Sequence, residues 1–310
     1  MHTISVAFER ANDKILKRMK IIWTILLCIT LISLLLFFPE ITHEGADIGI
    51  NLFMEALFPY LLPYLVLTNW LLKLTHSHKN VSFLVFIQTY GISAIGGYPT
   101  GAATITQLVK RNSITKKQAA YLLGICHCPS PLFLFGFVGS DLLNSSTLSW
   151  QYLILLHSFS FILLIIVYLN VPTLSNEVHR VPKDPTPFTT SIRESAPTIL
   201  IVATTIIFFT TIYHVFLHSV EVVFDSIPTY LELAIASFLE MTNGLFLLHQ
   251  NLYGDMLLFF TVVLLTTQSL SIHLQVIVIA RTANIAIRPY IMIRVLYSIV
   301  IPLLFALFFL

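Results

Sequence analysis

The sequence predicts an all-α polytopic membrane protein, and its composition, apolar runs and placement of basic residues carry the prediction. Of the 310 residues, 56% are apolar and 10% are charged, whereas soluble domains carry about 25% charged residues. Mean hydropathy is +0.86. Apolar runs long enough to cross a bilayer recur, and basic residues gather at their ends, as is typical of cytoplasmic loops. The net charge of +2 gives no reason to expect a nucleic-acid partner.

The chain begins with a basic segment, 1–20, which carries four Lys and Arg side chains between positions 14 and 20. The apolar run that follows, 21–38, is longer than the core of a secretory signal and long enough to span. We therefore expect a cytoplasmic N-terminal segment and then a single transmembrane domain over 21–310. The next stretch has Glu40, Glu44 and Asp47 without Lys or Arg, which indicates an outer loop.

Two apolar segments, 50–72 and 81–109, lie between that outer loop and a basic loop at 110–117. The first contains Pro59 and Pro63, which predict a bend or a hairpin. Since the chain passes from the outside to the inside over this stretch, one segment crosses the membrane and the other is re-entrant. The sequence leaves open which of the two is re-entrant.

The rest of the chain is expected to alternate crossings with short loops. The expected crossings are 118–139, 150–169, 197–217, 228–248, 256–280 and a last run to Leu310. The basic residues expected to mark the inside are Arg180, Lys183 and Arg193 in the Pro-rich loop 171–195, and Arg281, Arg288 and Arg294.

The segment 88–101 is the central feature of this prediction, because it holds four of the 11 glycines, together with Pro99, inside an apolar run. Glycine and proline cannot continue a regular helix here, and freed backbone groups at membrane depth need protein or a water-lined cavity around them. A kinked structural helix is the alternative, but broken helices of this kind build the solute sites of secondary transporters. The residues predicted to bind solute here are Gly96, Gly97, Tyr98, Pro99, Thr100, Gly101 and Thr104.

Weak internal similarity predicts two structural repeats, of inverted topology, over about 50–140 and 228–310. The break at 96–101 matches 268–273, and Leu67-Thr-Asn matches Met241-Thr-Asn, at a common offset of roughly 172 to 174 residues. The second repeat is then expected to contribute solute ligands of its own. These are Asn243, Ser271, His273 and Gln275.

Glu240 is the ionisable residue at membrane depth that we expect to act as a coupling group or polar relay, together with Thr242. A structural pair with Arg281 or Arg288 is the alternative. For an anionic solute, the N-termini of half-helices would supply unpaired N–H groups and a positive dipole end.

Cys126-His127-Cys128 contains soft metal ligands, but three adjacent residues cannot all face one ion from regular structure, and no second ligand cluster is visible. We therefore expect no metal site. No hydrolase or protease motif and no cofactor-binding loop occurs, so we expect neither an enzyme nor a cofactor.

Three motifs, taken in order, resemble the sporulation integral membrane protein YlbJ family of the nucleoside-recognition Gate group. They are Phe58-Pro-Tyr-Leu-Leu-Pro-Tyr64, Gly97-Tyr-Pro-Thr-Gly-Ala102 and Ser130-Pro-Leu-Phe133. The match continues through 231–244 and 271–275. It departs from the family pattern at Cys126-His127-Cys128 and at Gln268-Ser269. The resemblance adds Ser130 to the predicted solute site.

The resemblance implies a secondary transporter or channel of spore-forming bacteria, for a small anionic solute such as dipicolinate, in the cell or forespore membrane. A non-transporting scaffold of spore formation is the alternative, and it would not need polar residues at the helix breaks. The expected partners are a small solute and the lipid bilayer. The sequence does not distinguish a monomer from a homo-oligomer.

Overall fold

The computed structural model describes residues 2–75, 83–171, 185–224 and 226–310, and within these ranges it contains helices and no strand. In the described ranges, five helical spans are long and apolar enough to cross a membrane, as expected of an integral protein that crosses several times, and one of them, Gly254–Arg281, is broken at Gln268. They are Arg18–Phe37, Thr147–Asn170, Pro187–Phe224, Gly254–Arg281 and Arg288–Phe309. The sequence's basic markers Arg180 and Lys183 lie outside the described residues.

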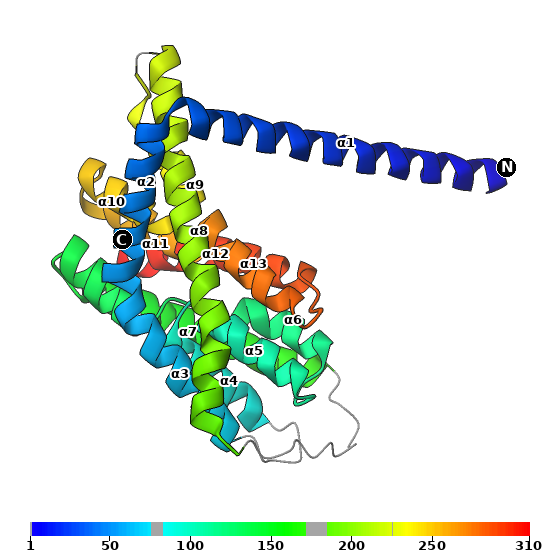
Figure 1. The fold of residues 1–310 in the computed structure, drawn as a ribbon. Coiled ribbons are helices and arrows are strands. Elements are labelled where there is room, and N and C mark those ends of the chain that lie inside the picture. Colours follow the sequence, from blue (N-terminus) through cyan, green and yellow to red (C-terminus); the bar gives the residue numbers. More distant parts are fainter. Residues whose placement is uncertain (1, 76–82, 172–184, 225) are drawn as a thin grey trace.

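The N-terminal half begins with long helices. α1 (His2–Phe37) projects away from the rest of the molecule (Figure 1), and none of the residues in its apolar window is buried, which suits contact with lipid. α2 (Pro39–Asn51), the π-helical stretch η1 (Leu52–Leu57) and α3 (Phe58–Thr75) follow without a break. The predicted outer loop after the first crossing is therefore wrong, because its residues form α2.

α2 packs closely against α8 (Pro187–Phe224), and two glycines make the approach possible. A Cβ on Gly45 would lie 3.0 Å from the Cα of Thr211, and one on Gly49 would lie 2.8 Å from the Cα of Ile207. Glycines four residues apart let helix backbones meet in a membrane. The start of α8 also shortens the Pro-rich loop predicted over 171–195.

The segment 81–109 is the one that folds back. It forms α4 (Phe83–Gly96) and α5 (Thr100–Lys110), which pack against each other across the turn 97–99. α3, by contrast, runs through Pro63 as one helix. After α5 the chain continues as α6 (Lys116–Ile125), a break at 126–130, the π-helical η2 (Phe133–Leu142) and α7 (Thr147–Asn170).

The C-terminal part shows the same order of elements. α9 (Thr229–Leu239) and α10 (Met241–Asn251) pack against each other as a second hairpin, so the crossing expected over 228–248 is split at Glu240. A broken span follows, made of α11 (Gly254–Thr267) and α12 (Leu270–Arg281), and then the continuous α13 (Arg288–Phe309). The two repeats stay a prediction, but each part of the chain contributes one hairpin and one broken span.

Candidate functional site

The first hairpin turns at Gly97, whose backbone has φ +69°, a conformation that favours glycine. Its N–H donates to the carbonyl of Ser93 at 2.8 Å, and the Thr100 N–H donates to the carbonyl of Gly97 at 2.9 Å. A Cβ on Gly97 would lie 2.7 Å from the backbone nitrogen of Ser130, so the turn sits directly against the break after α6. The Tyr98–Pro99 peptide bond is cis.

The second hairpin turns at Glu240, which is extended and only 3% exposed. Its carboxylate accepts hydrogen bonds from the backbone N–H groups of Thr242, at 2.8 Å, and Asn243, at 3.0 Å. Glu240 is therefore the N-cap of α10, where two orphan donors and the positive end of the helix dipole stabilise a negative charge. From the sequence, we expected Glu240 to act as a coupling group or polar relay, or to pair with an arginine. The structure adds a third role, that of a helix cap.

Two small adjoining cavities lie between the hairpin turns and the π-helical stretches. The larger, about 170 Å³, is lined by residues that include Glu55, Gly96 and Asp141. The smaller, about 70 Å³, is lined by residues that include Glu240, Thr242 and Gln275. Residues that line both are Leu57, Leu61, Tyr98, Ser130 and Phe133. Six predicted site residues thus meet around one space, namely Gly96, Tyr98, Ser130, Glu240, Thr242 and Gln275.

The other predicted residues lie behind this space. Thr100 donates its hydroxyl to the carbonyl of Gly96 at 3.1 Å, and Ser271 exchanges a hydrogen bond with Ser269 at 2.8 Å. Thr104 is fully buried, and its hydroxyl has no hydrogen-bond partner in the described part of the chain. Gly97 and Pro99 form the first turn, and His273 faces the carbonyl of Thr267 at the end of α11. Asn243 donates its backbone N–H to Glu240, and Gly101 lies in the first turn of α5, where a Cβ would meet the carbonyl of Cys126.

The broken end of α11 is closed by side chains from other elements. The carbonyl of Leu265 accepts hydrogen bonds from the hydroxyls of Tyr98, at 3.3 Å, and Tyr152, at 3.2 Å. The carbonyl of Thr267 faces His273 Nε2 at 2.9 Å. Because a carbonyl only accepts, Nε2 carries the proton, and Nδ1 accepts from the hydroxyl of Tyr290 at 2.7 Å. Both ring nitrogens of His273 are therefore engaged.

Arg294 joins the two broken spans. Its guanidinium donates to the carbonyl of His127 at 3.0 Å, just beyond α6, and to the carbonyl of Thr266 near the end of α11. It is 3% exposed and lies 4.9 Å from the centre of the Tyr297 ring. Each helix C-terminus carries roughly −0.5 of a charge, so two of them balance one guanidinium.

The prediction that Arg294 marks the cytoplasmic side is therefore wrong. Its position inside an apolar run, six residues after the start of α13 at Arg288, was the available signal, because an ionisable residue within a span usually faces the interior. Arg281 and Arg288 are exposed, as expected of residues at segment ends.

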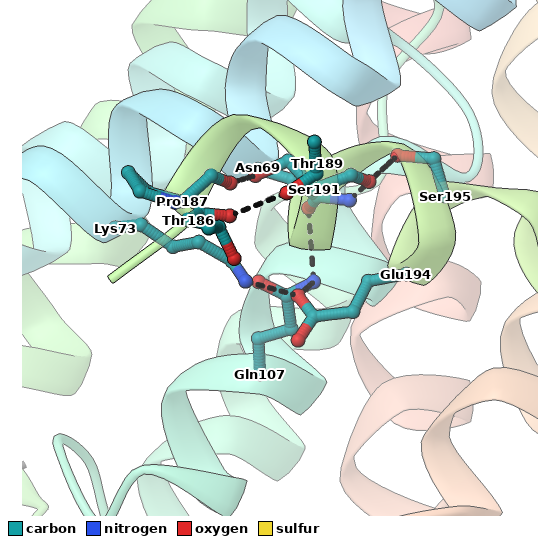
Figure 2. Close-up of polar contacts among 9 residues, drawn as sticks. All are labelled: Asn69, Lys73, Gln107, Thr186, Pro187, Thr189, Ser191, Glu194 and Ser195. Carbon is teal, nitrogen blue, oxygen red and sulfur yellow. Dashed lines mark hydrogen bonds and ion pairs between the residues drawn. The ribbon is translucent and has the colours of Figure 1, made fainter. Parts of the chain in front are cut away.

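Figure 2 shows a separate polar cluster at the far end of the first hairpin, formed by Asn69 and Lys73 of α3, Gln107 of α5, and Glu194 and Ser195 of α8. Lys73 Nζ lies 3.2 Å from Glu194 Oε2, and its side chain is 4% exposed. Gln107 Nε2 donates to Asn69 Oδ1 at 3.0 Å, and Asn69 Nδ2 donates to Ser195 Oγ at 2.9 Å. The cluster fastens α5 to the long helices.

Cys126 and Cys128 are free and buried within the core. Among the described residues, no three His, Cys, Asp or Glu side chains are grouped so that they could hold a metal ion. The His127 ring packs instead against Tyr98, with ring centres 4.7 Å apart, and against Tyr290, at 5.6 Å.

The architecture is that of a helical protein that crosses the membrane several times. The sporulation integral membrane protein YlbJ of Bacillus subtilis (strain 168) is 26% identical to this chain over 124 residues, which is 36% of this chain and 30% of that protein. The similarity therefore spans less than a third of the relative's length. No protein-family model and no solved structure matches the chain.

Proposed function

We propose that this protein is a secondary transporter for a small anionic solute, whose path runs through the space between the two hairpin turns. The observation that carries the proposal is the convergence of both turns on one lined cavity system within apolar, membrane-spanning structure. Transporters place their solute sites where broken helices meet near the middle of the bilayer.

The chemistry of the smaller cavity supports a polar solute with a negative group. The N-terminal turn of α10 contributes Thr242 to its wall, and the N-terminal part of α12 contributes Ile272 and Gln275. Helix N-termini favour anions. The similarity to a sporulation membrane protein makes dipicolinate, a small dicarboxylate, the first solute to test.

The test is uptake of labelled dipicolinate by proteoliposomes that contain the full chain. Ser130→Leu and Gln275→Leu would fill or depolarise the cavity, whereas Gln88→Leu changes an exposed position of α4 and serves as the matched control. We expect uptake by the wild type and by the control, and loss of uptake in both cavity variants.

Failure of a well-inserted wild type to take up dipicolinate would remove this solute from the proposal. The scaffold alternative predicts that Ser130→Leu and Gln275→Leu sustain normal spore formation in cells, whereas transport of a different solute predicts that both variants fail there. Uptake that persists in both cavity variants would instead place the path elsewhere.

A further inference from the structure

The carboxylate of Glu240 occupies the position at which an external anion would bind to α10. One oxygen, Oε2, accepts from the N–H groups of both Thr242 and Asn243, and Oε1 lies 3.4 Å from the Thr242 hydroxyl. These N–H groups are the ones that a helix leaves unpaired at its start, and they carry its positive partial charge. The Glu240 carboxylate thus occupies the anion-binding N-terminus of α10.

The cavity beside this carboxylate, about 70 Å³, is the smaller of the two. A solute carboxylate can bind the N–H groups at the start of α10 only if the side chain that already accepts from them moves away. That side chain is Glu240, which lines the cavity and is held by hydrogen bonds at its tip.

Gln275 is a second polar group on the same cavity, independent of the helix end. It is 3% exposed and donates from Nε2 to the hydroxyl of Thr205 at 3.0 Å. In the described part of the chain its amide oxygen has no hydrogen-bond partner. Because amide oxygen and nitrogen can exchange places and a hydroxyl can donate or accept, Gln275 can offer either group to an occupant.

We propose that Glu240 is a built-in competitor for the carboxylate of the solute, and that it leaves the start of α10 when it takes up a proton. This inference rests on the proposed transport function. A protonated carboxylic acid is a weaker acceptor than a carboxylate, so its hold on the two N–H groups is lost. The solute carboxylate then takes those groups, so the start of α10 faces one carboxylate before and after the exchange.

The proton moves onto a carboxylate oxygen of Glu240, and no covalent bond within the chain breaks. Two carboxylates at one helix end would repel in a low-dielectric site, which makes proton uptake and anion entry occur together. Each negative charge exchanged at this position is therefore accompanied by one proton.

The neighbouring charged groups do not offer another proton acceptor at the start of α10. Among the described residues, no Lys, Arg or His lines either cavity. Glu55 of η1 and Asp141 of η2 line the adjoining cavity and are exposed. On the neighbouring elements, Tyr98 and His273 have hydrogen-bond partners of their own, and Tyr213 pairs with Glu232. His249 and Asp255 are exposed near helix ends.

The first measurement is equilibrium binding of labelled dipicolinate to the purified full-length protein across acidic to alkaline pH. We expect the wild type to bind about tenfold tighter on the acidic side, and Glu240→Ala to bind equally well at all pH values. Glu232→Gln, on α9, is the matched control and should keep the wild-type pH dependence. The same pH dependence in Glu240→Ala and wild type would overturn the proposal.

The second measurement does not depend on any solute. Hydrogen exchange at the amides of Thr242 and Asn243 should lose protection on acidification in the wild type, beyond the intrinsic change in exchange rate, while protection in Glu240→Ala should not depend on pH. Protection that persists at acidic pH in the wild type would overturn the release of Glu240. Loss of protection without dipicolinate binding would instead reject dipicolinate and retain the release.

Discussion

The two hairpin turns differ in how the second helix of each begins. α5 starts after Pro99, and within the described residues no side chain caps it, whereas α10 starts under the carboxylate of Glu240. The first hairpin is fixed at its turn by a glycine close to Ser130, and at its far end by the hydrogen bonds of Gln107 to Asn69 and Glu194 shown in Figure 2. The first hairpin thus contributes a wall of the cavity without a capping side chain, whereas the second holds a carboxylate at the start of α10, which is the group that we propose to leave.

The largest effect is expected from removing the group that holds both broken spans behind the turns. Arg294→Met leaves the Thr266 carbonyl without its side-chain donor and the His127 carbonyl with only the long hydrogen bond from Gln268 Nε2 at 3.5 Å, which costs about 2–5 kcal/mol of the free energy of unfolding. Thermal unfolding in detergent measures it, with the exposed Arg288→Met as control. Equal melting temperatures for the two variants would contradict the joining role of Arg294.

The next effect separates backbone strain from crowding at the first turn. Gly97→Ala meets both a positive φ and the backbone of Ser130, so we expect a loss of about 2–4 kcal/mol. Gly254→Ala has φ +55° with nothing within 4 Å of its new Cβ, and should lose only about 1 kcal/mol. Denaturant unfolding of both compares them, and similar losses would mean that the turn is not pressed against Ser130.

A smaller effect is expected at the second turn. Glu240→Ala removes the N-cap of α10 and should cost about 1 kcal/mol of stability, comparable with Thr115→Ala, which removes the cap of α6. The same unfolding experiment checks this. A cost several times larger for Glu240→Ala would show that Glu240 is a fixed structural group, and would contradict its proposed release from α10.

The smallest effect is expected where two donors share one acceptor. Tyr98→Phe and Tyr152→Phe each remove one hydrogen bond to the carbonyl of Leu265 while the other remains, so each should cost under about 1 kcal/mol. The double variant should cost more than the sum, because the carbonyl then loses both donors. Additive losses in a double-mutant cycle would argue that the two hydroxyls act independently.

The sequence predicted the helical membrane fold and located the breaks at 96–101 and near 268, because glycine, proline and polar residues interrupt long apolar runs there. It did not identify the close contact of α2 and α8, although Gly45 and Gly49 have the spacing that allows it. It also could not show that Glu240 caps α10, since that depends on an extended backbone between two helices.

The order of elements favours a different pairing of the breaks from the one that short sequence matches indicated. By order, the turn 97–99 corresponds to Glu240, and the break at 126–130 corresponds to Gln268 and Ser269. Arg294 links the latter two breaks although His127 lies 167 residues away from it. Contacts over such distances arise from packing, and local patterns in one sequence do not contain them.

Protection of introduced cysteines tests most directly whether both turns line one solute path. Ser130→Cys and Thr242→Cys, each in a Cys28→Ser background, place a thiol on either side of the smaller cavity. We expect a small water-soluble alkylating reagent to modify both, and dipicolinate at acidic pH to slow both modifications. Slowing at neither position, in a protein that still takes up dipicolinate, would contradict the account.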